Sequence, residues 1–447
     1  MSKFQELAKI NSRIFLRIYL FAFLILNSIW LIPGTIAIRY FVILIGFIVL
    51  SIQIAQVQFP KFSIKNYLPS VCLVALFIWI LFHRLFITSA PALMDVELNT
   101  IWKRTLVEGL FAFGLGVFLR LKNKSNDKNY FLLAVFVPVV MFFISDISGY
   151  FKLGIIHWNY ADPEKPYISK YQFVLFAMIA YSWIVFNLVN EINKCTTKKM
   201  ILWLTSLLSI ALSIFLVNGK NGFLYMGLIL IAVMIQLLWK NFRDIKILLL
   251  VVTLCIGSSF IGYYHVKNNP TWMNLIQDIE VARHTDQIQV WKNYHDGELN
   301  ELQNPSGKSV SNTTYFRTAW IIEGAKLIPD NPLGYGLIQN SFKYIAKEKW
   351  PDSTLSHTHS GWLDIILGLG IPGFLLILVS FIALIKKGFA SDNFYAKSAI
   401  WVLPTIFLAF LTSELSEKIS FEVMIFYLAF YCGSTLHCEV KVTPKVT

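Results

Sequence analysis

The segment that decides the architecture runs from His357 to Val379 and reads HTHSGWLDIILGLGIPGFLLILV. It joins the end of the longest polar stretch, residues 265–361, to an apolar run long enough to cross a membrane as a helix. We therefore expect a water-exposed loop to enter a membrane helix close to His359. An imidazole at such a boundary is within reach of both the aqueous phase and the membrane. A boundary residue that only makes hydrogen bonds is the simpler alternative.

Composition sets the class of the protein. The chain has 447 residues, a length that alone would suggest two or three domains. However, 56% of the residues are hydrophobic, only 15% are charged, and the mean hydropathy is +0.59. A chain of this composition places most of its surface in lipid. Its runs of about 20 apolar residues predict helices, because an open backbone cannot satisfy its polar groups in hydrocarbon. The sequence thus predicts an all-α polytopic membrane protein.

The net charge of +13 does not indicate a nucleic-acid partner, because Lys and Arg lie in short clusters between apolar runs, as in cytoplasmic loops. A basic cluster at residues 3–17 places the N-terminus in the cytoplasm. The first apolar run lacks a small-residue cleavage site, so we expect an uncleaved start-anchor. Alternating directions then predict about twelve spans and a cytoplasmic C-terminus. The runs are 14–32, 36–58, 68–88, 102–121, 130–148, 172–190, 200–217, 223–239, 246–264, 362–385, 397–413 and 421–437.

These spans divide the chain into four parts. We expect nine transmembrane helices in residues 1–264, a large and mostly helical periplasmic loop in 265–361, three more helices in 362–437, and a cytoplasmic tail in 438–447. Within the loop, apolar spacing predicts a helix from Arg317 to Leu327, which ends before the Pro-Asp-Asn-Pro turn. None of the five cysteines lies in the loop, so no disulfide framework is expected there, and the cysteines are read as packing residues.

Three ordered motifs occupy residues 315–373. The pair His359-Ser360 is followed after nine residues by Gly370 and then Gly373, in the form H-[S/N/Q]-(nine)-G-x-x-G. Upstream lie YFRTAW at residues 315–320 and IPDNPLGYG at residues 328–336. Together they resemble the O-antigen ligase superfamily, which also includes O-antigen polymerases and bacterial protein O-oligosaccharyltransferases. The chain is most similar to the O-antigen ligases.

The resemblance implies a GT-C-like fold and a membrane glycosyltransferase. Such an enzyme would transfer a glycan from undecaprenyl diphosphate to the lipid A-core oligosaccharide at the periplasmic face of the bacterial inner membrane, in lipopolysaccharide biosynthesis, without a metal ion or other cofactor. Nothing in the residues selects the acceptor, so a growing O-antigen chain or a protein hydroxyl stays open. A transporter or flippase is the alternative of another class, but two related halves and midplane charges would be expected of it.

Transfer from a diphosphate-linked sugar needs a base and a partner for the leaving group. Histidine suits the first role, because its ordinary pKa near 6.5 leaves it mostly neutral and able to accept a proton. His359, the histidine of the motif, is the predicted base, and His357 is the second candidate. Arg317 is the predicted partner of the leaving phosphates, since a guanidinium stays charged and can donate two hydrogen bonds to phosphate oxygens. A surface arginine stacked on Trp320 is the alternative.

Further candidates surround these residues. The turn at residues 218–222 holds Lys220 where the family usually carries an arginine, and a lysine there can contact phosphate as a point charge. Arg104 either pairs with Glu108 one helical turn away or joins the phosphate site. Asp364 either orients His359 or only favours the helix start through its charge. The substrate-binding candidates are Lys220, His357, Arg104, Trp320 and Asp364.

Two metal sites are the alternatives to a metal-free mechanism. The His357-Thr358-His359 pair lacks the third and fourth ligands that a zinc site needs. Asp95 and Glu97, in the loop predicted for residues 89–101, resemble the acidic pair of metal-dependent glycosyltransferases, although such a pairing is common by chance.

Overall fold

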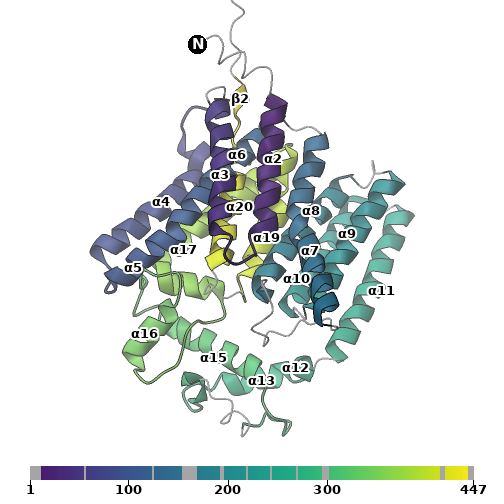
Figure 1. Ribbon diagram of the computed structural model, residues 1–447. Helices are drawn as coiled ribbons and strands as arrows, with labels where there is room; N and C mark the ends of the chain where they lie inside the picture. The colour runs from purple at the N-terminus through teal and green to yellow at the C-terminus, as the bar shows by residue number, and fades with distance from the viewer. Residues whose placement is uncertain are drawn as a thin grey trace, which may run out of the picture.

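The computed structural model describes residues 12–54, 57–122, 125–153, 169–191, 196–217, 220–241, 244–267, 270–293, 302–412 and 418–440. These residues form a bundle of long helices with a smaller helical unit at one end (Figure 1). Each of the predicted apolar runs overlaps one bundle helix. They are α2 (Ser12–Ile29), α3 (Ile36–Ile54), α4 (Ile64–Phe86), α6 (Lys103–Lys122), α7 (Ser125–Leu153), α8 (Lys170–Glu191), α9 (Thr197–Leu216), α10 (Lys220–Asn241), α11 (Ile245–Lys267), α17 (Gly361–Phe389), α19 (Ala399–Ala409) and α20 (Lys418–Thr435).

Six of these helices are long and apolar enough to cross a membrane: α4, α7, α8, α9, α10 and α17. Shorter apolar helical stretches occur in α2, in α3, in α11 and across residues 394–409, where α18 (Phe394–Lys397) leads to α19. The chain is therefore an all-α polytopic membrane protein. The total of twelve spans stays a prediction.

The two ends of the bundle differ. At the end where α2 begins, strand β1 (Val57–Gln58) pairs antiparallel with β2 (Glu439–Val440), which brings the connection after α3 against the C-terminal segment (Figure 1). At the opposite end lie the helices of the long polar segment: α12 (Pro270–Met273), α13 (Leu275–Ala282), the short 3-10 helix at Val290–Lys292, α15 (Asn312–Lys326) and α16 (Ser341–Lys349). The segments predicted to lie on opposite sides of the membrane thus lie at opposite ends of the molecule.

Local predictions held in some places and failed in others. The predicted helix from Arg317 is present and begins earlier, at Asn312, in α15. The predicted loop at residues 89–101 was wrong, because α5 (Pro91–Glu97) and a π-helical turn (Leu98–Trp102) lead directly into α6. Met94, Ile101 and Trp102 are buried there, so the segment gains packing as a helix that it would lose as a loop.

Buried charges tie the bundle together around α6. Arg104 does not pair with Glu108 as one prediction had it. It lies 3.6 Å from Glu422 of α20, while Arg39 of α3 lies 3.5 Å from Glu108 and 3.2 Å from Glu422. Two positive and two negative groups compensate one another inside the bundle, where an isolated charge would be costly.

Candidate active site

The loop that carries the two histidines has an unusual backbone. His359 has a φ of +59°, in the left-handed region that non-glycine residues rarely adopt. Ser360 follows as the N-cap of α17. Strained positions of this kind are found at functional sites, where the surrounding structure holds them in place.

Asp364 holds this loop from the first turn of α17. One of its carboxylate oxygens accepts hydrogen bonds from the Thr358 backbone N–H at 3.0 Å and from the Thr358 hydroxyl at 2.7 Å. The Ser360 N–H in turn donates to the Thr358 hydroxyl oxygen at 3.2 Å. The carboxylate therefore fixes Thr358, the residue between the two histidines.

Helix α15 packs against the same loop. The indole of Trp320 stacks on the imidazole of His359, with ring centroids 5.2 Å apart and an angle of 4° between the planes. One turn further along α15, a Cβ on Gly324 would lie 2.8 Å from the Thr358 methyl carbon, so only glycine allows this approach. The Trp320 N–H donates to the Trp291 carbonyl at 2.8 Å and fixes the indole. His357 meets His359 edge to face, at 4.4 Å.

Arg317 lies one helical turn before Trp320 on α15. It donates a hydrogen bond to the Tyr171 hydroxyl at 3.0 Å, and its guanidinium lies 5.9 Å from the centroid of that ring. Its charge also acts on Lys170 and Lys220. Lys220, which was predicted in a turn, is the first residue of α10. The structure therefore brings the two predicted phosphate-binding cations together and adds a third, Lys170.

The last turn of α19 connects the start of α17 to α10. The Trp362 indole N–H donates to the Phe407 carbonyl at 2.8 Å, and the Trp362 backbone N–H donates to the Phe410 carbonyl at 3.3 Å. Two residues later, the Thr412 hydroxyl lies 2.6 Å from the Tyr225 hydroxyl of α10. These contacts link the start of α17, which follows the histidine loop, to α10, which begins at Lys220.

The loop of the IPDNPLGYG motif, residues 328–336, binds α17 through its backbone. The N–H groups of Tyr335 and Gly336 donate to the Leu367 and Gly368 carbonyls at 2.8 and 2.7 Å. Helix α17 is kinked at this point, since Gly370 has a φ of +71°. The loop thereby satisfies carbonyls that the kink releases from the helical ladder.

Residues 204–378 match the family model described as O-antigen ligase. Over these residues the chain is similar to the O-antigen ligase family. This confirms the resemblance and supports a membrane enzyme of the O-antigen ligase or polymerase type. The matched ligase domain contains Lys220, Arg317 and His359, whereas Lys170 lies before it. No curated protein matches the chain.

Side chains of α4 and α5, which lie outside the matched residues, hydrogen-bond to the backbone of residues within the match. The Trp79 N–H donates to the Leu369 carbonyl at 2.8 Å, and a ring nitrogen of His83 lies 3.0 Å from the Gly334 carbonyl. Glu97 accepts hydrogen bonds from the Ile338 and Gln339 N–H groups at 2.7 and 2.8 Å.

The Glu97 carboxyl is itself perturbed by this position. Burial raises its pKa to about 7, against the opposing effects of the backbone N–H groups of Ile338 and Gln339 and of the charge of Lys418. The carboxyl therefore titrates near neutral pH while it holds the loop that precedes α16.

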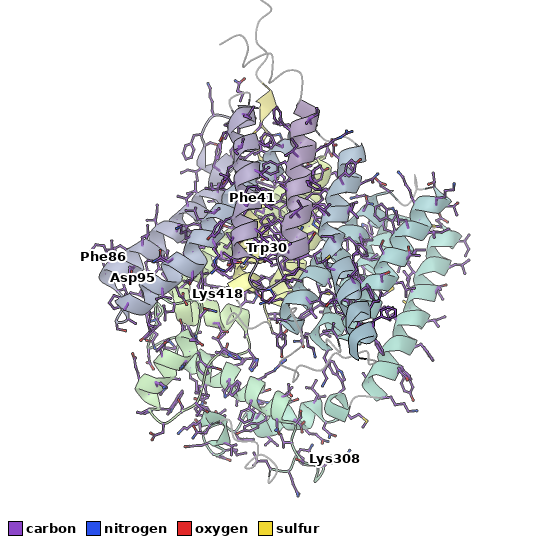
Figure 2. The ribbon with its side chains drawn as sticks, viewed as in Figure 1. Trp30, Phe41, Phe86, Asp95, Lys308 and Lys418 are labelled. Atoms are coloured by element: carbon purple, nitrogen blue, oxygen red, sulfur yellow. The ribbon has the colours of Figure 1, made fainter. Side chains whose placement is uncertain are left out.

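The other predicted residues lie elsewhere. Arg104 belongs to the buried charge network around Glu422. Asp95 is exposed and receives two hydrogen bonds from Arg84, at 2.6 and 2.7 Å, near the tip of α5 (Figure 2). Asp95 and Glu97 thus have separate partners. Within the described ranges, no group of three or more His, Cys, Asp or Glu side chains is placed to hold a metal ion.

The sequence gives no signal for Lys170 or Trp79. It indicates His83 only as a charge in a span that should face the protein interior, and Glu97 only as one half of an acidic pair. A lysine directly before an apolar run reads as an ordinary boundary residue, and His83 reads as a charge in a span. Their partners lie far away in sequence, so spacing carries no signal for them.

Proposed function

We propose that the protein is an O-antigen ligase that transfers a glycan from undecaprenyl diphosphate to the lipid A-core oligosaccharide, in lipopolysaccharide biosynthesis. The reaction takes place at the periplasmic face of the bacterial inner membrane, with both chain termini in the cytoplasm. The stack of His359 on Trp320, one helical turn from Arg317 and inside the family domain, is the observation that carries this proposal.

In the proposed reaction, a ring nitrogen of neutral His359 takes the proton of the acceptor hydroxyl as that oxygen attacks the anomeric carbon of the donor sugar. The new glycosidic bond forms as the bond to the diphosphate oxygen breaks. A positioned general base typically contributes about 10²–10⁴-fold in rate. The stack on Trp320 and the left-handed backbone fix the direction in which the imidazole points.

The departing undecaprenyl diphosphate gains negative charge, which must be met where it develops. Arg317 and Lys220 supply fixed positive charges, and Arg317 is oriented by its hydrogen bond to Tyr171. The imidazolium then returns its proton to water. Fixed cations take the role that a metal ion plays in other glycosyltransferases.

The acceptor is tested with one set of reactions. Purified protein in lipid nanodiscs receives labelled undecaprenyl-diphosphate glycan together with lipid A-core, a non-reducing glycan end or a serine- and threonine-bearing peptide, in separate reactions. The proposal predicts labelled lipid A-core and little label elsewhere. Label on the glycan would identify an O-antigen polymerase, and label on the peptide a protein O-oligosaccharyltransferase. In proteoliposomes, movement of the donor from one leaflet to the other without any transfer would identify a flippase.

A further inference from the structure

We infer that Lys170 is a third phosphate-binding residue, and that Lys170, Lys220 and Arg317 form one site selective for a diphosphate over a monophosphate. The inference rests on the proposed function, because it concerns how the same enzyme holds its donor. Lys170 lies outside residues 204–378, so this cation comes from a part of the chain beyond the matched family domain.

The first turns of α8 and α10 lie against each other. Lys170 and Lys220 are the first residues of these two helices. A Cβ on Gly222 of α10 would lie 3.1 Å from the Val174 side chain of α8, which shows how closely the two helix starts approach. The two lysines are therefore placed at the same end of the bundle, and the charge of Lys220 acts on Lys170.

Arg317 completes the cluster from the polar segment. Its guanidinium hydrogen-bonds to Tyr171, the residue directly after Lys170, and its charge acts on both lysines. All three side chains are only partly exposed, so their mutual repulsion is weakly screened by water. Three cations gathered from three separate helices are an arrangement that an anion stabilises.

The starts of α8 and α10 add to the positive electrostatic potential of the three cations. Two helices of 22 residues each begin at the cluster, and the start of a helix carries partial positive charge and backbone N–H groups without helical partners. A diphosphate has more charge and more acceptor oxygens than a monophosphate, so it gains more from a third cation. Lys220 is a point charge, whereas an arginine at this position would donate two parallel hydrogen bonds to phosphate. The added charge of Lys170 compensates for this difference.

The inference is tested by direct binding. Wild-type protein in nanodiscs is titrated with undecaprenyl diphosphate and, separately, with undecaprenyl monophosphate, and bound lipid is counted by native mass spectrometry. We expect the wild type to prefer the diphosphate, and Lys170→Ala to lower diphosphate affinity about 10-fold or more while monophosphate affinity changes much less. Lys170→Arg should restore most of the preference. Lys308→Ala is the matched control, because Lys308 is an exposed lysine at the far end of the polar segment (Figure 2).

Each other outcome has a defined meaning. An unchanged preference in Lys170→Ala overturns the inference and leaves the proposed function standing. An equal loss of affinity for both lipids that Lys170→Arg fails to restore also overturns the inference, because that pattern indicates a role of Lys170 in folding. The proposed function would still stand. A wild type that does not bind undecaprenyl diphosphate overturns the proposed function together with the inference.

Discussion

The side chain of His359 is held by its neighbours rather than by its own backbone preference. Its φ of +59° is unfavourable for a residue with a Cβ, and costs of about 1–3 kcal/mol are typical of such positions. The bonds of Asp364 to Thr358 and the flat stack on Trp320 offset this cost. This support is what the proposed role of His359 as a positioned base requires.

Arg317 is predicted to act on the donor. Arg317→Ala should raise the KM for the lipid-linked glycan and lower kcat, because leaving-group charge is largest in the transition state. Arg317→Lys should recover part of the lost activity, since it restores the charge but not the two parallel N–H donors of the guanidinium. Steady-state kinetics at varied donor concentration provide the measurement. Arg283→Ala is the control, because Arg283 is an exposed arginine of the same polar segment that pairs with Glu280. Unchanged donor kinetics in Arg317→Ala would remove this residue from the phosphate site.

At the scale of elements, the kink of α17 and the loop at residues 331–340 form one unit. Both need glycine at the contact. A Cβ on Gly368 would lie 2.0 Å from the Leu337 carbonyl oxygen, and one on Gly334 would lie 2.3 Å from the Gly370 nitrogen. The spacing of the two motifs in the sequence thus reflects a backbone contact that places the start of α17 relative to α15.

Gly368→Ala is therefore expected to lower both the thermal unfolding midpoint and transfer activity, because backbone atoms on each side cannot move away cheaply. Gly227→Ala in α10 is the matched substitution, since a Cβ there meets nothing within 4 Å. It should be neutral or stabilise the helix by about 0.5–1 kcal/mol. Thermal unfolding in detergent compares the two variants. Equal effects would show that the close packing of the two motifs contributes nothing.

The contact of α5 with the same loop predicts a pH dependence. Burial raises the pKa of Glu97 to about 7, so between about pH 4.5 and 7 the folded protein keeps a proton that the unfolded chain has lost. Stability should therefore fall as the pH rises through this window and level off above it, by at most roughly 3 kcal/mol from this group. Glu97→Gln should flatten the profile of unfolding midpoint against pH. A variant whose slope equals that of the wild type would contradict this role of Glu97.

At the scale of the whole molecule, much of the architecture follows from the sequence. The apolar runs correctly predicted the position of every bundle helix, because hydropathy along the chain reflects lipid contact directly. The motifs also led to His359 and Arg317, and the turn at residues 218–222 led to Lys220. Contacts between distant helices could not be predicted, such as the ion pair of Arg104 with Glu422 and the hydrogen bond of Arg317 to Tyr171. The helical form of residues 91–102 also depends on tertiary packing.

The two-ended bundle predicts a definite sidedness in the membrane. Lys308→Cys, in the polar segment, should react with a membrane-impermeant maleimide in intact spheroplasts. Lys61→Cys, in the connection after β1, should react only after permeabilisation. The unmodified protein gives the background from the native cysteines. Labelling of both positions from one side would contradict the predicted periplasmic location of the site.

The base role of His359 is tested most directly by single-turnover transfer with purified donor and lipid A-core acceptor. Wild type, His357→Ala and His359→Ala are compared, and donor binding is measured for each. The account predicts that His359→Ala binds undecaprenyl-diphosphate glycan as the wild type does but transfers it about 10²–10⁴-fold more slowly, with a smaller loss in His357→Ala. Transfer by His359→Ala at the wild-type rate would contradict it.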